Sequence, residues 1–235
     1  MKYVGETRVV DEADLPTFAP PYVLSGSCLV AVGLWSGDTP VPSGFTAVCM
    51  LGRPVGIVIA NHYTEPPQTL PIRYREVIAA SLARRGTTIV ASPFDMVLDE
   101  QIPVDLGRLH YGMPKRLDAT LRFETTPATF AATANDLAVD ARMHGPLASL
   151  LALPLRLAFA LGVRAITAAI DVTGTAYPPP RRARIALGPR GTGQSARVIH
   201  CTSNGRTLHA LWCQSWEFTS TNLGAPSLID PQGST

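Results

Sequence analysis

Long apolar runs that are broken by glycine and proline, rather than framed by helix caps, constrain most strongly what this 235-residue chain can fold into. The clearest examples are Tyr22 to Leu34 and Phe45 to His62, which are rich in Val, Ile and Cys. Runs of this composition indicate β-strands. Further strand-like runs are expected at 77–82, 87–98, 119–124, 129–143, 164–172, 182–187, 197–201 and 207–218. The sequence therefore predicts a mainly β fold.

Helical patterns are rare by comparison. The clearest helix is predicted at Pro146 to Leu161, with proline in its first turn and Gly162 after its last. This segment is apolar nearly all round, so we expect the sheet or a neighbouring subunit to enclose it. It is too short to span a membrane, and it carries Pro154 and Arg156.

The expected architecture is antiparallel α+β with one or two helices, because strands and helices do not alternate along the sequence. A curved sheet or a closed β-barrel would remove exposed strand edges. The string Gly188 to Gly193 separates two strand-like runs and is predicted to be a hairpin loop; no helix follows it, so it is a weak candidate for a phosphate cradle. Residues 1–235 are expected to form one domain of a homo-oligomer.

Charge and cysteine content argue against several classes of protein. Twenty basic and 18 acidic residues give a formal net charge of +2, which provides no one-sign field for nucleic acid. The cysteines at positions 28, 49, 201 and 213 form no C-x-x-C pair and are interpreted as small core residues. Residues 1–14 are polar and acidic and lack the apolar run of a signal peptide. We expect a cytoplasmic protein with no nucleic-acid or membrane partner.

Metal and serine-nucleophile chemistry have little support. The five histidines show no H-x-x-x-H or H-E-x-x-H spacing, so no metal site is predicted. The sequence has no G-x-S-x-G motif and no convincing Ser-His-Asp order. No cofactor is expected.

Lysine is far rarer than arginine in this chain. Two lysines stand against 18 arginines, and only Lys115 lies away from the N-terminus, in the string Gly-Arg-Leu-His-Tyr-Gly-Met-Pro-Lys-Arg at 107–116. A GC-rich genome would explain the excess of arginine, and a retained lysine then suggests a role that arginine cannot fill. A primary amine can lose its proton and attack a carbonyl, whereas a guanidinium stays protonated. Lys115 is therefore the candidate nucleophile.

Gly107-Arg108, Gly112-Met113-Pro114-Lys115-Arg116 and the upstream Tyr74-Arg75-Glu76 together form a recognisable pattern. They resemble the acetoacetate decarboxylase superfamily, which shows Gly-Arg, then Gly-x-Pro-Lys-Lys, with Tyr-x-Glu some forty residues earlier. The resemblance covers roughly residues 57–124. Two motifs in the right order and separation make it more specific than a Pro-Lys pair alone.

The resemblance implies a lysine that forms a Schiff base with a ketone and uses the iminium as an electron sink. Decarboxylases of the family expel carbon dioxide in this way, and related members carry out aldol and dehydration chemistry on oxo acids. Lys115 and Glu76 would be the catalytic residues, with Glu76 as general acid and base. Taken alone, Glu76 would be interpreted as a surface carboxylate paired with Arg73 or Arg75.

Five further residues are candidates for substrate binding: Arg108, Tyr74, Arg116, Met113 and Asn61. Tyr74 would either orient the carboxylate of Glu76 or serve as an aromatic core residue. Arg108 would either satisfy loop carbonyls near the lysine or bind a substrate carboxylate.

Lys115 must be activated to act as a nucleophile, because an ordinary lysine amine, with a pKa of about 10.4, is almost wholly protonated at pH 7. Burial among Leu109, Met113 and Leu117, or repulsion from Arg116, would favour the neutral amine. We favour burial, since neighbouring residues of an extended segment point to opposite faces and the Arg116 charge would point away from the amine.

Two departures from the family pattern concern the substrate. Where decarboxylating members carry a second acidic residue, this chain has Asn61, with Glu65 nearby, and it has no arginine between Arg8 and Arg53 to gather a substrate carboxylate. Both departures leave the lysine chemistry intact. They point away from acetoacetate, towards a different oxo acid or a bulkier, less polar ketone.

The expected function is that of a cofactor-free Schiff-base lyase acting on a keto acid or related ketone through Lys115, with β-keto acid decarboxylation as the leading reaction. Within the superfamily, an aldolase-dehydratase is an alternative, as is a cyclase or isomerase that uses its pocket for shape alone. An alternative of another class is a non-catalytic binder of an apolar small molecule, suggested by the apolar segment Pro146 to Leu161.

Overall fold

The computed structural model describes residues 2–4, 9–18, 20, 22–65, 72–143, 170–222 and 227–228. The N-terminal elements are β1 (Lys2–Val4), β2 (Val9–Asp11) and the 3-10 helix η1 (Glu12–Thr17). They are followed by β3 (Val23–Trp35), β4 (Thr46–Ala47), β5 (Cys49–Met50), β6 (Arg53–Glu65), β7 (Tyr74–Arg85) and β8 (Thr88–Leu98). Next are helix α1 (Gln101–Tyr111), β9 (Lys115–Leu117), β10 (Arg122–Thr125), β11 (Thr129–Ala134) and β12 (Leu137–Met143). The C-terminal elements are β13 (Ile170–Gly174), β14 (Arg181–Ser203), β15 (Arg206–Asn222) and β16 (Ser227–Leu228).

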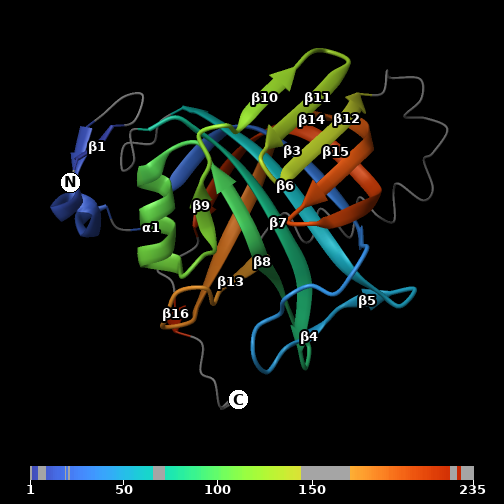
Figure 1. The fold of residues 1–235 in the computed structure, drawn as a ribbon, viewed down its shortest axis with the longest axis horizontal. Helices are drawn as coiled ribbons and strands as arrows, with labels where there is room; N and C mark the ends of the chain where they lie inside the picture. The colour runs from blue at the N-terminus through green and yellow to red at the C-terminus, as the bar shows by residue number, and fades with distance from the viewer. Residues whose placement is uncertain are drawn as a thin grey trace.

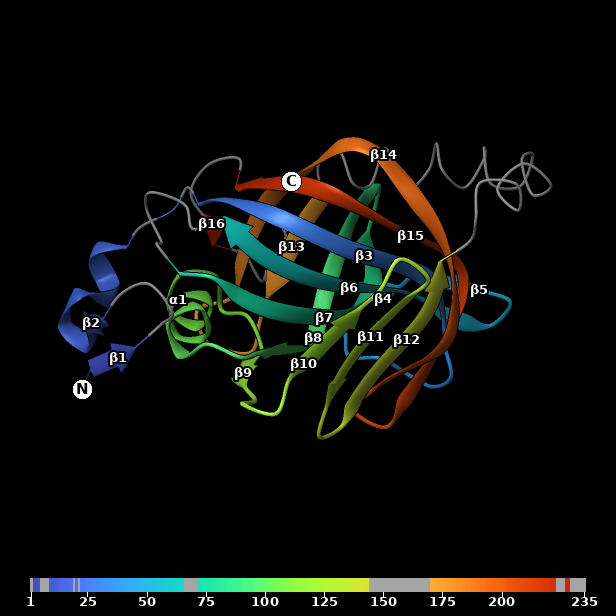
Figure 2. The same cartoon turned by 90° about the horizontal axis from the view of Figure 1, so that it is seen from above.

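Fourteen of the described strands form one curved sheet, which Figures 1 and 2 show from two sides. Its main path runs β10-β11-β12-β14-β13-β8-β7-β6-β3-β15, and β14 also pairs with β15. Neighbouring strands are antiparallel, except that β8 runs parallel to β9 and to β13. The expected mainly β, antiparallel fold with few helices is confirmed, and its scaffold is a curved sheet.

Both faces of the sheet are covered, which explains why its central strands have nearly continuous apolar sequences. Along β6, Ile57 and Val58 belong to two separate hydrophobic clusters, because successive side chains of a strand point to opposite faces. Helix α1 adds Leu106 to the first cluster, and β11 adds Phe130 to the second. The first cluster surrounds the candidate site.

Helix α1 departs from the sequence-based expectation, which placed no helix at 101–111. Its buried face carries Ile102, Leu106 and Tyr111, which recur at close to helical spacing. Pro103 fits the first turn, and Gly112 ends the helix with a φ of 62°, in the left-handed region. The signals are present in the sequence, but they are confined to an 11-residue segment.

Three other expectations are corrected. The run 129–143 is two strands, because a turn at Asn135 and Asp136 separates β11 from β12. The string Gly188 to Gly193 is part of β14, where a β-bulge interrupts its pairing with β15, and is not a hairpin loop. Cys49 is exposed, whereas the other three cysteines are buried as expected.

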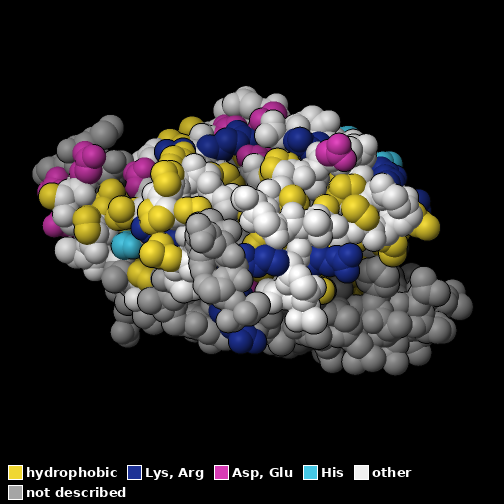
Figure 3. Space-filling model, turned by 90° about the horizontal axis from the view of Figure 1, so that it is seen from below, with side chains coloured by type: hydrophobic (Ala, Val, Ile, Leu, Met, Phe, Trp, Pro, Cys, Tyr) yellow, Lys and Arg dark blue, Asp and Glu magenta, His cyan; other side chains and the backbone are white. Residues whose placement is uncertain are grey.

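The predicted helix at Pro146 to Leu161 lies outside the described residues, as do residues 164–169 of an expected strand. Among the described residues, no helix has the length and apolar character needed to cross a membrane. On the face drawn in Figure 3, the described basic, acidic and hydrophobic side chains are interspersed.

Candidate active site

A partly open cavity of about 140 Å³ lies between helix α1 and the concave part of the sheet. Residues 57, 59, 61 and 63 of β6 and residues 74, 76, 78 and 80 of β7 line it, because alternate residues of a strand share a face. Pro103, Leu106 and Gly107 line it from α1. Glu76 and Lys115 are the only charged side chains among the described residues of this lining. The cavity is therefore an apolar site with one acid and one amine.

Lys115 and Glu76 form an ion pair in this cavity, with Nζ 2.8 Å from Oε1. Their side chains are 12% and 4% exposed, respectively. Lys115 begins β9 opposite Met96 of β8, whereas Glu76 lies in β7 opposite Asn61 of β6. The fold thus brings together two motifs that are far apart in sequence. Glu76 is buried, so its interpretation as a surface carboxylate is wrong.

The backbone at Lys115 is held by the end of helix α1. The Nε atom of Arg108 donates a hydrogen bond to the carbonyl oxygen of Lys115 at 2.8 Å, and its guanidinium carbon lies 5.2 Å from the ring centroid of Tyr177. Gly112 reverses the chain between α1 and β9, and a Cβ there would lie 2.8 Å from the carbonyl oxygen of Tyr177. Arg108 does not line the cavity and instead satisfies the backbone carbonyl of Lys115.

Tyr63 orients the carboxylate of Glu76. Its hydroxyl donates to Oε2 of Glu76 at 3.2 Å and accepts a hydrogen bond from Nδ2 of Asn61 at 2.9 Å. Burial, reinforced by the negative charge of Glu76, holds the pKa of Tyr63 well above its ordinary value, so the hydroxyl remains a donor. The ring of Tyr74 packs on that of Tyr63, with centroids 4.4 Å apart, and burial raises the pKa of Tyr74 as well.

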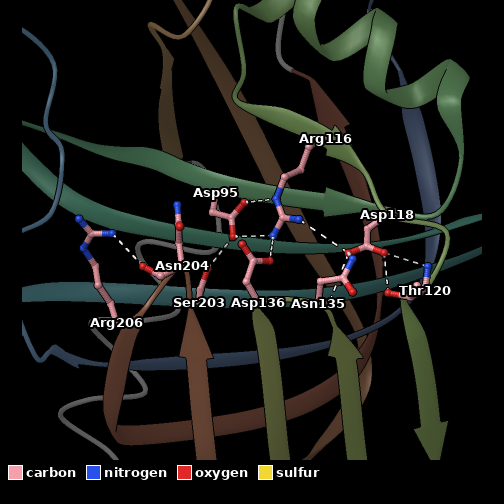
Figure 4. Close-up of polar contacts among 9 residues, drawn as sticks. All are labelled: Asp95, Arg116, Asp118, Thr120, Asn135, Asp136, Ser203, Asn204 and Arg206. Carbon is pink, nitrogen blue, oxygen red and sulfur yellow. Dashed lines mark hydrogen bonds and ion pairs between the residues drawn. The ribbon is translucent and has the colours of Figure 1, made fainter.

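Arg116 is not part of the cavity lining and binds a cluster of carboxylates instead, as Figure 4 shows. Its Nε and Nη2 atoms donate to the two carboxylate oxygens of Asp95 at 2.8 and 3.2 Å, and it forms ion pairs with Asp118 and Asp136. Asp95 also accepts a hydrogen bond from Ser203 at 2.8 Å. The hydrogen bonds with Asp95 raise the pKa of Arg116 above its ordinary value.

The carboxylate cluster ties β9 to the neighbouring strands. Asp118 accepts hydrogen bonds from Thr120 and Asn135, which lower its pKa although burial acts to raise it. Arg116 belongs to β9, Asp95 to β8 and Ser203 to β14, so the contacts around Asp95 join these three strands. The guanidinium charge is compensated by these carboxylates, and Arg116 is not among the residues that line the cavity with Lys115.

The structure brings most of the predicted site residues together. Lys115, Glu76, Tyr74, Met113 and Asn61 all line the cavity, whereas Arg108 and Arg116 do not. Leu109 and Leu117, expected as walls around the amine, are 44% and 45% exposed.

Sequence reasoning missed three tyrosines of the lining: Tyr22, Tyr63 and Tyr111. The alternation of β6 carries a signal for Tyr63, which lies two residues after Asn61. Its partnership with Glu76 requires the register between β6 and β7, in which Tyr63 lies opposite Tyr74. Within the described ranges, no group of His, Cys, Asp and Glu side chains is arranged to hold a metal ion.

Comparisons with known proteins identify the fold. No model of a known protein family and no curated protein matches the sequence. Among solved structures, acetoacetate decarboxylase from Legionella pneumophila superposes with a TM-score of 0.63 and 12% identity, over 90% of this chain and 88% of that one. This chain has the acetoacetate decarboxylase-like fold. The resemblance inferred from the lysine and glutamate motifs is therefore confirmed at the level of the fold.

Two further solved structures share this fold but belong to enzymes that are not described as acetoacetate decarboxylases. The enduracididine biosynthesis enzyme MppR, in a complex with pyruvate, matches with a TM-score of 0.55 and 14% identity, over 98% of this chain and 99% of that one. An acetoacetate decarboxylase-like enzyme from Sphingomonas wittichii RW1 has a TM-score of 0.51 and 12% identity, over 97% and 99% of the two chains. The fold thus accommodates more than one described function.

Proposed function

We propose that this chain is a cofactor-free Schiff-base lyase in which Lys115 forms an imine with the carbonyl of an oxo compound. The observation that carries the proposal is the ion pair between Lys115 and Glu76, 2.8 Å long and buried in an otherwise apolar cavity. A buried amine beside a proton acceptor is the arrangement that nucleophilic catalysis by lysine requires. The shared fold with acetoacetate decarboxylase supports the same chemistry.

Proton transfer within the pair would begin the reaction. Transfer of the proton from Nζ of Lys115 to Oε1 of Glu76, 2.8 Å away, would leave a neutral amine beside a neutral acid. The amine attacks the ketone carbon while Glu76 protonates the carbonyl oxygen. Glu76 then takes a proton from the nitrogen and returns it to the hydroxyl, which leaves as water. The iminium and the Glu76 carboxylate remain as an ion pair.

The iminium would then accept electrons from a carbon–carbon bond at the α-carbon. In a β-keto acid this bond leads to the carboxylate, and its cleavage releases carbon dioxide and leaves an enamine. Glu76 is still a carboxylate at this point and takes up a proton from solvent water. In a β-hydroxy ketone, Glu76 takes the hydroxyl proton, an aldehyde leaves, and the same enamine forms. Protonation of the enamine carbon by Glu76 and hydrolysis of the imine by water regenerate Lys115. Tyr63 would hold the carboxylate in place throughout these steps.

Decarboxylation of a β-keto acid is the reaction expected first from the resemblance. One observation favours the aldol-type alternative: among the described residues, Lys115 is the sole cation of the cavity lining, so no second cation is seen to bind a substrate carboxylate. A shape-only enzyme and a non-catalytic binder remain distinct alternatives, because neither requires an imine.

Borohydride trapping tests the proposal. Incubation with a small ketone and borohydride should add the mass of the reduced ketone at Lys115, and peptide mapping is straightforward because Lys2 and the N-terminal amine are the only competing amines. Lys115→Arg should lose the adduct and the turnover while keeping the fold, since a guanidinium cannot form the imine. Product formation that survives Lys115→Arg would indicate the shape-only enzyme, and tight ligand binding without an adduct would indicate the binder.

A further inference from the structure

The charge of the cavity limits which carbonyl compounds it can accept. Glu76 and Lys115 compensate each other, and the described lining contributes no other charged side chain. An iminium at Lys115 keeps the single positive charge of the amine, so a neutral ketone leaves the pair balanced. A ketone with a carboxylate would add an unpaired anion to an apolar site, which is strongly unfavourable.

The size and walls of the cavity point in the same direction. Ile57, Ile59 and Ile78 line it from the sheet, and Leu106 and Met113 line the opposite side. An apolar cavity of about 150 Å³ is large enough to hold benzene, and this cavity has about 140 Å³. Because the cavity is partly open to solvent, a ligand of about six to eight non-hydrogen atoms, mostly carbon, therefore fits beside the lysine.

Asn61 supplies one unsatisfied polar atom in this lining. Its side chain is buried, with the residue 2% exposed, and its Nδ2 atom is used by Tyr63, but Oδ1 has no hydrogen-bond partner among the described residues. Buried polar side chains are nearly always paired, so an orphaned acceptor in a cavity indicates a donor on the ligand. Asn61 lies directly opposite Glu76 across β6 and β7, so their Cβ atoms are about 5 Å apart. The ligand's donor thus lies a few bonds from its carbonyl.

We infer that the site takes a neutral, mainly apolar ketone that carries a hydroxyl group near its carbonyl, with the hydroxyl donating to Oδ1 of Asn61. This inference rests on the proposed function, because it assumes that the carbonyl reacts at Lys115. It assigns Asn61 the role of a specificity residue. A β-hydroxy ketone, the substrate or product of an aldol reaction, has this arrangement of groups.

Two matched pairs of ketones test the inference by borohydride trapping at Lys115. Levulinate carries a carboxylate where 5-methyl-2-hexanone carries an isopropyl group of the same shape. In the second pair, 4-hydroxy-2-butanone carries a hydroxyl where 2-pentanone carries a methyl group. The concentration that gives half-maximal trapping rate is measured for each ketone. We expect 5-methyl-2-hexanone to require at least about tenfold less ligand than levulinate, because only the acid places an unpaired charge in the cavity.

Asn61→Leu isolates the hydroxyl contact, because it removes the acceptor at similar volume. The variant also loses the bond to Tyr63, but this change affects both members of a pair and cancels in their ratio. We expect the preference for 4-hydroxy-2-butanone over 2-pentanone to fall about fivefold in Asn61→Leu, the value of one ordinary hydrogen bond. The charge comparison uses the wild-type chain and so does not depend on whether this variant folds.

The outcomes separate the inference from the proposed function. Levulinate that is trapped at Lys115 as readily as 5-methyl-2-hexanone would overturn the neutral-ligand inference and leave the Schiff-base proposal standing. An unchanged hydroxyl preference in folded Asn61→Leu would overturn the role of Asn61. If none of the four ketones is trapped at Lys115, both the proposed function and the inference fail.

Discussion

The stem of Lys115 occupies the space that a side chain at Gly107 would fill. A Cβ atom on Gly107 would lie 2.2 Å from Cδ and 2.5 Å from Cε of Lys115, far closer than atoms can approach. Gly107 lies in α1 and Lys115 begins β9, so the helix packs directly on the lysine. The Gly-Arg motif therefore has a steric reason: glycine admits the stem, and Arg108 binds the lysine carbonyl.

Gly107→Ala should displace the amine of Lys115 from Glu76 while leaving the fold largely intact, because the clash is with the outer part of a flexible side chain. The exchange of the α-protons of 2-pentanone with heavy water reports iminium and enamine formation, and we expect it to slow at least about tenfold, as misplaced reacting groups cost large factors in rate. Gly37→Ala is the matched control, since a Cβ there meets no atom of the described residues within 4 Å, apart from its neighbours in the chain. Equal exchange rates in the two variants would contradict the steric role of Gly107.

Glu76→Gln should slow α-proton exchange by about a hundredfold or more, because the amide cannot transfer protons to and from the enamine. Borohydride trapping at Lys115 should persist, although more slowly, since the amine remains. The exposed residue Glu124 provides the control variant Glu124→Gln. Unchanged exchange in Glu76→Gln would show that this carboxylate is only a structural partner of the lysine.

Tyr63→Phe removes the donor to Oε2 of Glu76 and keeps the packing against Tyr74. Hydrogen bonds to charged groups contribute about 1.5–3 kcal/mol, so we expect α-proton exchange to slow by about tenfold or more. Tyr74→Phe keeps the ring and leaves the bond from Tyr63 to Glu76 in place, so its effect should be smaller. The reverse order of effects would assign the orientation of Glu76 to Tyr74.

Sequence patterns predicted the central strands well because a sheet covered on both faces needs long apolar runs, and β3, β6, β7 and β8 all have them. Helix α1 was missed because its apolar stripe is short and its 11 residues include polar side chains such as Asp105 and Arg108. The division of 129–143 depends on a turn at Asn135 and Asp136 that interrupts an otherwise suitable run. Local composition thus identifies long strands better than short elements.

The sequence predicted those site residues that belong to a recognisable motif. It did not predict the residues whose contacts depend on how distant strands pair. Lys115 and Glu76 follow from lysine scarcity and the family motifs. Tyr63 acts on Glu76 only because β6 and β7 pair with Asn61 opposite Glu76. Arg116 adjoins the lysine in sequence, but its direction depends on Asp95, Asp118 and Asp136, which come from other parts of the chain.

Burial raises the pKa of the Cys201 and Cys213 thiols to about 12, from an ordinary value of 9.0. The folded chain keeps these protons above pH 9, whereas the unfolded chain releases them, so the free energy of unfolding should fall as the pH rises from 9. Each thiol contributes a slope of at most about 1.4 kcal/mol per pH unit. Urea unfolding between pH 8 and 10 should show a shallower slope in Cys201→Ala/Cys213→Ala than in the exposed control Cys49→Ala. Equal slopes would mean that the thiols ionise in the folded chain.

The reactivity of the Lys115 amine should depend on the apolar cavity lining and not on the neighbouring charge of Arg116. Arg116 is compensated by Asp95, Asp118 and Asp136, so removing its charge should matter little. The double variant Arg116→Gln/Asp95→Asn removes Arg116 together with the carboxylate that it binds through two hydrogen bonds, and so leaves no buried Asp95 carboxylate without its partner. In this variant, the rate of Lys115 modification by a small amine-reactive label at pH 8 should stay within about twofold of the wild-type rate, well under the tenfold that corresponds to about 1.4 kcal/mol. Met113→Gln places a polar group in the cavity lining, where it would stabilise the ammonium form of Lys115, so this variant should slow labelling more. The control Met113→Leu keeps the lining apolar and should leave the labelling rate unchanged. A large change in the Arg116 double variant, with none in Met113→Gln, would show that adjacent charge and not burial activates the lysine.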